Sequence, residues 1–260
     1  MRIILMALML GLLTQNNLYA QTPQEKGLAI AQEADRRDTG FGDQTANLIM
    51  ILKNKQGQTS TRYLRIKTLE VDNDGDKSLS IFDRPRDIKG TALLSFSHKV
   101  DTDDQWLYLP ALKRVKRISS ANKSGAFVGS EFAYEDLSSQ EVEKYSYKYI
   151  KDDTINGLPA FVIERDPVDE NSGYTRQVVW IDKPEYRVQK IDYYDRKNDL
   201  LKTLTLSDYH QYLNKYWRAH TYLMVNHQTG KSTQLKWSDF KFRVGLTDRD
   251  FDRSTLKRAR

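Results

Sequence analysis

Four histidines are the residues of this chain best suited to hold a metal ion or move a proton. They are His98, His210, His220 and His227. None stands at the spacing from another histidine or from a carboxylate that defines a helical zinc motif such as H-E-x-x-H. The sequence therefore predicts no metal site and no cofactor.

Three aspartates with alternate spacing resemble the start of a calcium-binding loop. Asp72, Asp74 and Asp76 match the first ligand positions of an EF-hand. However, Gly75 stands at the fourth position instead of the sixth, and Asp83 replaces the bidentate glutamate that closes such a loop. We therefore interpret this segment as a polar hairpin turn.

Signatures of covalent catalysis are missing from the sequence. There is no cysteine, no G-x-S-x-G elbow and no glycine-rich phosphate loop. Neighbouring acids at 141 and 143, or at 152 and 153, could form a glycosidase pair, but spacing alone does not place them across a substrate. We expect that the protein is not an enzyme. A hydrolase of envelope lipid or glycan is the alternative, and it predicts turnover that one acid or histidine substitution would abolish.

The densest basic cluster consists of Lys113, Arg114, Lys116 and Arg117. Lysine at an exposed strand edge discourages edge-to-edge aggregation, which is one interpretation. The other is a docking patch for an anionic membrane surface or an acidic partner protein. Both interpretations place these four side chains in solvent.

The first twenty residues have the layout of a secretory signal peptide. Arg2 precedes an apolar run over residues 3–13, a polar stretch follows, and Ala20 ends the segment. The apolar run is about half of the roughly 20 residues that span a bilayer. Because there is no cysteine to carry a lipid, we expect an exported, soluble and unlipidated protein. Residues 21–260 are then one mature domain.

Composition favours strands and argues against nucleic acid. The chain has 15 Tyr, 9 Phe and 4 Trp residues, and aromatic side chains suit a pleated, half-buried surface. The net charge of +6 is modest and spread along the chain, which is no footprint of a nucleic-acid-binding protein.

The periodicity predicts a mainly β protein with helical ends. A capping box at Thr22 and Glu25 begins a helix that should stop near residues 38–42. Eleven to thirteen strands follow at the short spacing of an antiparallel fold. In the last strand, over residues 233–242, a bulge near Ser238 would reconcile two phases of apolar residues. Phe251 and Leu256 should anchor a short helical tail.

Two segments leave their role open. Residues 119–140 lack alternation, so we expect a long, partly helical excursion, and excursions of that length within a compact domain are usually functional. Tyr145, Tyr147 and Tyr149 share one face of a strand. That face could be a ligand wall or ordinary cross-strand packing.

The central part of the chain resembles a known family. Residues 106–118 read WLYLPALKRVKRI and residues 127–137 read FVGSEFAYEDL. These stretches are similar to the LolA-like outer membrane lipoprotein-sorting proteins of Gram-negative bacteria. Weaker support comes from residues 36–38, 179–182 and 245–256.

This resemblance implies both a fold and a function. The fold would be a half-open antiparallel β-barrel with helices plugging its mouth. The protein would be a periplasmic, non-enzymatic carrier that shields the acyl chains of a lipoprotein or lipid on the way to the outer membrane. Such relatives often accompany exporters of the resistance-nodulation-division type. The alternative is therefore an accessory subunit that docks to an inner-membrane exporter without its own cargo, and an outer-membrane acceptor is a further expected partner.

Aromatic side chains of the family-like stretches are the expected lining of the cavity, and the excursion over residues 119–140 is the expected lid. The predicted ligand-binding residues are Trp106, Tyr108, Phe127, Phe132, Tyr134 and Trp180.

Overall fold

The computed structural model describes residues 21–257. The predicted signal peptide, residues 1–20, lies outside the described residues. The first element is helix α1 (Pro23–Asp38), which begins with the predicted capping box: the Thr22 hydroxyl accepts from the Glu25 amide, and the Glu25 carboxylate accepts from the Thr22 amide. No helix among residues 21–257 is long and apolar enough to cross a membrane.

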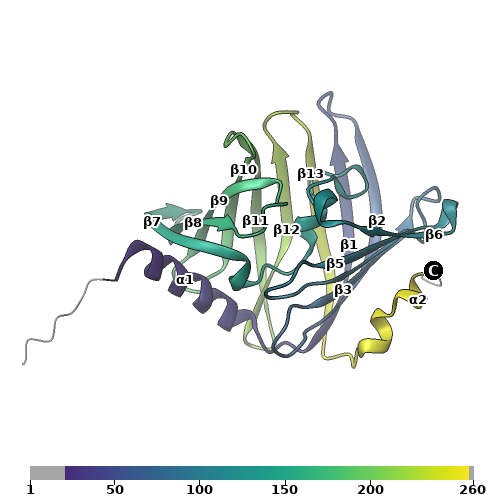
Figure 1. Ribbon diagram of the computed structural model, residues 1–260, viewed down its shortest axis with the longest axis horizontal. Helices are drawn as coiled ribbons and strands as arrows, with labels where there is room; N and C mark the ends of the chain where they lie inside the picture. Colours follow the sequence, from purple (N-terminus) through teal and green to yellow (C-terminus); the bar gives the residue numbers. More distant parts are fainter. Residues whose placement is uncertain (1–20, 258–260) are drawn as a thin grey trace, which may run out of the picture.

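Thirteen strands form one antiparallel sheet, at the upper limit of the predicted number (Figure 1). Every consecutive pair of strands is adjacent in the sheet except β6 and β7, and β1 also pairs with β13. The strands are β1 (Asp43–Lys53), β2 (Thr59–Leu69), β3 (Lys77–Arg84), β4 (Ala92–Phe96), β5 (Asp104–Leu109), β6 (Arg114–Ile118), β7 (Tyr145–Ile155), β8 (Leu158–Pro167), β9 (Tyr174–Asp182), β10 (Val188–Asp195), β11 (Leu200–Tyr212), β12 (Tyr216–Asn226) and β13 (Ser232–Phe242).

The sheet does not close into a barrel, which corrects part of the expected fold. Strands β6 and β7 are consecutive in sequence but form the two opposite edges of the sheet. The chain between them, residues 119–144, must therefore cross the full width of the sheet, and we call it the strap. Helices do not plug the opening as a group either, because α1 is the only long helix among the described residues.

The strap contains the predicted excursion, residues 119–140, which is partly helical as expected. It contains four short 3₁₀ helices: η2 (Ser120–Asn122), η3 (Phe127–Gly129), η4 (Tyr134–Leu137) and η5 (Val142–Lys144). A buried ion pair of 2.6 Å between Asp136 and Lys202 ties it to β11. Glu131 is bound to Asn226 on β12 through a 2.8 Å hydrogen bond. These contacts hold the strap against the concave face of the sheet.

The opposite face of β3–β6 is covered by the C-terminal segment. It contains the short helices η6 (Asp248–Phe251) and α2 (Arg253–Leu256). Phe251 and Leu256 are fully buried there, in a cluster with Trp106, so the predicted anchors of the tail are confirmed. Another turn, η1 (Pro110–Leu112), connects β5 with β6.

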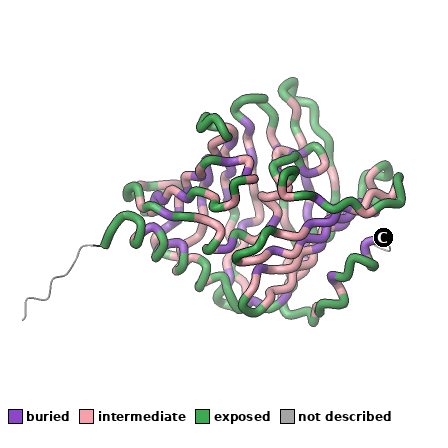
Figure 2. Tube along the Cα trace, viewed as in Figure 1, coloured by how far each residue is buried: buried purple, intermediate pink, exposed green. Residues whose placement is uncertain are grey.

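The predicted bulge in the last strand is also confirmed. Asp239 has a left-handed backbone with φ of 54°, and the β1–β13 register shifts between Thr45 and Asn47, opposite this point. Such a shift moves Phe240 onto the same face as Trp237. Figure 2 shows that buried residues concentrate in the sheet and the adjoining strap, whereas the hairpin tips and much of α1 are exposed.

Candidate functional site

A cavity of about 1120 Å³ lies on the concave face of the sheet, at the end that α1 covers. It is larger than the roughly 300–1,000 Å³ of ordinary small-molecule sites. Strands from both halves of the sheet contribute to its wall, together with the C-terminal half of α1 and the end of the strap.

The floor of the cavity is apolar because inward-facing residues of neighbouring strands are in register. Ile163 on β8 lies opposite Val179 on β9, and Ile181 follows two residues later on the same face. Across the cavity the wall contains the small side chains of Ala46 and Ala219. All five are buried.

The rim of the cavity carries paired charges. Arg187 lies 2.8 Å from the fully buried carboxylate of Asp182. Arg218 forms an ion pair with Asp38 at the end of α1. These pairs link the helix and the β9–β10 turn to the sheet around the opening.

Burial raises the pKa of two acids at the mouth. Burial raises the pKa of Asp76 to about 7, and the nearby Glu141 carboxylate adds to this shift. Burial also raises the pKa of Glu141, although a hydrogen bond from the Ser139 hydroxyl opposes the change. Part of the mouth is therefore less negative near neutral pH than its residue types imply.

One polar atom in the wall has no partner. The indole Nε1 of Trp237 is buried and makes no hydrogen bond to any described residue. Trp237 lines the cavity beside Phe240, whose ring stacks against it at 5.9 Å. Buried N–H groups are almost always bonded, so this donor is an exception among the residues around the cavity.

Helix α1 approaches the sheet closely at its first turns. A Cβ added to Gly27 would lie 2.7 Å from the Tyr149 amide nitrogen, so only glycine allows this packing. The Lys26 ammonium lies 3.4 Å from the centre of the Tyr149 ring. Further along, Ala31 and Ala34 border the cavity. The helix is thus docked at its start and forms a wall at its end.

Three of the predicted ligand-binding residues lie on the convex face. Trp106 and Tyr108 pack under the C-terminal segment, with Trp106 in the cluster of Phe251. Trp180 donates to Asp153 at 3.1 Å, while its neighbours Val179 and Ile181 line the cavity. Val179 and Ile181 share one face of β9, and Trp180 lies on the other. This alternation could have identified Val179 and Ile181 as cavity residues, but an aromatic side chain alone could not.

The other three lie under the strap. Phe127 and Phe132 are buried in the main core, and the Tyr134 ring lies 5.8 Å from that of Phe127. None of the three lines the large cavity, although Phe132 borders a second hollow of about 420 Å³ near Lys202. Of the tyrosine face on β7, Tyr147 lines the large cavity.

All four residues of the basic cluster are exposed, in and just before the edge strand β6. Arg117 is paired with Asp104 at 2.5 Å. The cluster therefore lies at an exposed strand edge, as both interpretations require, and its role in docking stays a prediction.

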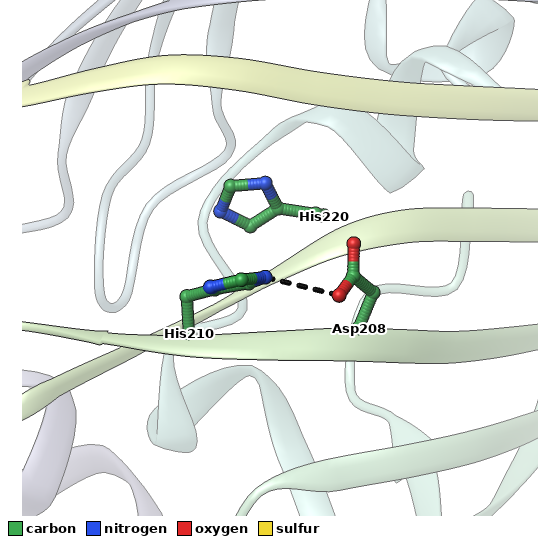
Figure 3. Close-up of side chains that lie close together, drawn as sticks. All are labelled: Asp208, His210 and His220. Carbon is green, nitrogen blue, oxygen red and sulfur yellow. Dashed lines mark hydrogen bonds and ion pairs between the residues drawn. The ribbon is translucent and has the colours of Figure 1, made fainter.

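One group of side chains has ligand types that suit a transition metal (Figure 3). Ligand atoms of Asp208, His210 and His220 lie within 4.8 Å of one another. Sequence spacing missed the group because β12 supplies one histidine and β11 the other two residues. However, His210 is already bonded to Asp208, and the Tyr212 hydroxyl occupies Nε2 of His220. None of the three lines the cavity, and we assign the group no role.

Comparisons with known proteins and structures identify the family of the chain. A family model described as "-like: Uncharacterized protein" matches residues 74–258. A solved structure provisionally described as an outer membrane lipoprotein-sorting protein domain, from Vibrio parahaemolyticus, is 62% identical (TM-score 0.89). It aligns over 90% of this chain and 99% of its own. A comparison with curated proteins found no match.

Two further structures extend the relationship. A DUF1329 family protein from Desulfovibrio piger is 30% identical, with a TM-score of 0.86. A LolA superfamily protein from Nitrosomonas europaea is 20% identical, with a TM-score of 0.70, and shows the same fold. Each covers 90% of this chain and 99% of its own. The protein belongs to the LolA-like family of outer membrane lipoprotein-sorting proteins, as its central motifs predicted.

Proposed function

We propose that the protein is a non-enzymatic carrier that holds acyl chains of a lipoprotein or lipid in this cavity. It would act in the periplasm, between an inner-membrane donor and an outer-membrane acceptor. The observation that carries the proposal is the hollow itself, with its apolar floor of Ile163, Val179 and Ile181.

The energetics require such a hollow. Each methylene removed from water is worth about 0.8 kcal/mol, so a sixteen-carbon chain costs on the order of 10 kcal/mol in water. A cavity of about 1120 Å³ offers room to offset much of that cost. The name of the 62% identical relative and the predicted signal peptide support a role in lipoprotein sorting outside the cytoplasm.

The test places a charge on the cavity wall. Ile66 on β2 is half-buried and lines the cavity. We expect Ile66→Glu to weaken binding of a fluorescent fatty acid by the full mature chain at least tenfold, because a carboxylate cannot be desolvated against an alkyl chain without large cost. Val225→Glu is the matched control, because Val225 is also half-buried but does not line the cavity.

Equal binding by Ile66→Glu and the wild type would contradict the proposal. So would an equal loss in both variants while both remain folded. Mass spectrometry of lipids extracted from the purified protein supplies an independent measurement, since a carrier should retain apolar ligands.

The role of the strap as a lid is a separate part of the proposal. Phe127 and Phe132 would then contact cargo when the strap moves. Phe127→Leu and Phe132→Leu keep the buried positions apolar, so each variant should fold and still weaken fatty-acid binding. Unchanged binding in both folded variants would show that the two rings serve the core alone.

A docking subunit without cargo is the second candidate, and the exposed basic edge favours it. Leu112, at the tip beside these charges, is 63% exposed. Reversing Lys113 and Lys116 to glutamate should then abolish association with inner-membrane components while the purified protein carries no lipid. Retained lipid together with unchanged association would exclude this candidate.

A further inference from the structure

Arg165 is a buried cation on the wall of the cavity. It lies on β8, is only 9% exposed, and is among the residues that border the hollow. Two residues earlier on the same face of the strand stands Ile163, which belongs to the apolar floor.

No carboxylate forms an ion pair with this guanidinium among the described residues. Its Nε donates to the Gln177 side-chain oxygen at 2.8 Å, and its Nη2 donates to the Gln140 side-chain oxygen at 3.1 Å. The Tyr145 ring lies 4.5 Å from the guanidinium carbon. Its Nη1 donates to no described residue, so the cation is oriented but its charge is not neutralised.

Other arginines that line the cavity differ in this respect. Arg37 pairs with Glu33 at 2.7 Å, Arg187 pairs with Asp182, and Arg218 pairs with Asp38. A buried charge without a counter-ion is costly. An anion that binds in the cavity would supply the missing counter-ion and lower this cost.

The neighbouring residues define where that anion would sit. Strand register aligns Tyr147, Arg165, Gln177 and Tyr193 across β7–β10, which forms a polar row. The next inward row contains Ile163, Val179 and Ile191. Tyr147 and Arg165 of the first row border the cavity, as do Ile163 and Val179 of the second. A headgroup at Arg165 therefore leads its tail onto Ile163 and Val179.

We propose that Arg165 receives the anionic headgroup, a carboxylate or a phosphate, of an amphiphilic cargo whose tail lies along the apolar floor. This inference rests on the proposed carrier function and adds the chemical class of the ligand. Guanidinium suits both anions because its planar N–H groups match two oxygens at once. Gln140 belongs to the strap, so the strap helps to orient the receptor.

The experiment compares three ligands of equal chain length at pH 8 with the delipidated mature chain. They are palmitate, palmitoyl lysophosphatidic acid and the neutral monopalmitoylglycerol, each with a single chain. We expect the wild type to prefer at least one anionic ligand over the neutral one by ten- to a hundredfold, as charged hydrogen bonds typically provide. The two anionic arms distinguish a carboxylate from a phosphate.

Two substitutions assign the preference to Arg165. Arg165→Met should remove it by weakening anion binding at least tenfold while neutral binding is unchanged, and Arg165→Lys should restore part of it. Arg176→Met is the control, because Arg176 pairs with Glu164 at 3.2 Å and does not line the cavity. Thermal unfolding confirms that each variant is folded.

Three results would overturn the inference. If the wild type binds all three ligands equally, the arginine has no such role, although the carrier function stands. If Arg165→Met binds neutral and anionic ligands equally weakly, the residue supports the shape of the cavity and does not distinguish charged from neutral ligands. If the wild type binds none of the ligands, the carrier function itself is wrong, and this inference with it.

Discussion

The concave face of the sheet has a filled end, under the strap, and a hollow end, under α1. Under the strap, large side chains such as Phe82, Phe127 and Met50 meet at almost no exposure and fill the space. Under α1, Ala46 and Ala219 face a hollow of about 1120 Å³. The difference shows that a single curved sheet supplies both a core and a container, depending on which segment covers it.

The covers also differ in how they are held. The strap is fixed by the buried Asp136–Lys202 pair, whose side chains are each 4% exposed. Helix α1 is held by a close backbone approach at Gly27 and by the Arg218–Asp38 pair at the rim, in which Asp38 is largely exposed. We therefore expect damage to the strap to unfold the protein, and damage to α1 to open it.

The largest effect is expected from breaking the strap pair. Lys202→Met keeps the length of the side chain but leaves the Asp136 carboxylate buried without its cation. We expect a loss of about 3–5 kcal/mol in the free energy of unfolding, measured by urea denaturation. Lys183→Met breaks the pair with Asp152, whose side chains are 31% and 54% exposed, and should cost less than about 1 kcal/mol. Similar losses in the two variants would show that the strap is not specially anchored.

A smaller effect is expected where α1 meets β7. Gly27→Ala places a methyl group 2.7 Å from a backbone nitrogen that cannot move aside. We expect a cost of about 1–3 kcal/mol and faster proteolysis within α1 than in the rest of the chain. Gln32→Ala, on the exposed side of the helix, is the control. Protection equal to that of the wild type would mean that the helix tolerates a shift.

The smallest effect is expected from the acid at the mouth. Burial raises the pKa of Asp76 from 3.8 to about 7, so the folded protein binds a proton that the unfolded chain releases between these values. The contribution of this group to stability therefore falls as pH rises from about 4 to 7. Asp76→Asn should gain about 1–2 kcal/mol on the wild type between pH 6 and pH 8. Asp72→Asn, in the same turn but exposed, should show no such gain, and parallel pH profiles for Asp76→Asn and the wild type would contradict the assignment.

Local elements were largely readable from the chain. The capping box at Thr22 and the polar turn at residues 72–76 are confirmed, and each depends on neighbours within a few residues. The anchors Phe251 and Leu256 are confirmed as well, although they are buried against Trp106, which is distant in sequence. The bulge near Ser238 followed from a change of parity that only an extra residue explains.

The cavity wall was not readable in the same way. Trp106 and Trp180 have the size and polarity of ligand-binding residues, but they lie on the convex face. Alternation separates the two faces of a strand without saying which one is concave. The choice depends on where residues distant in sequence fold back, here the C-terminal segment on one face and the strap on the other.

By itself, the sequence determined the strands, the first helix, the tail and the family, since these follow from short-range pattern and motif. Only the tertiary structure decided that the sheet stays open, that a hollow lies beneath α1, and that Arg165 borders it without a counter-ion. The physical reason is that the free volume and the charge balance at one place depend on side chains from many strands. Those side chains are distant in sequence, so no single stretch of the chain determines either quantity.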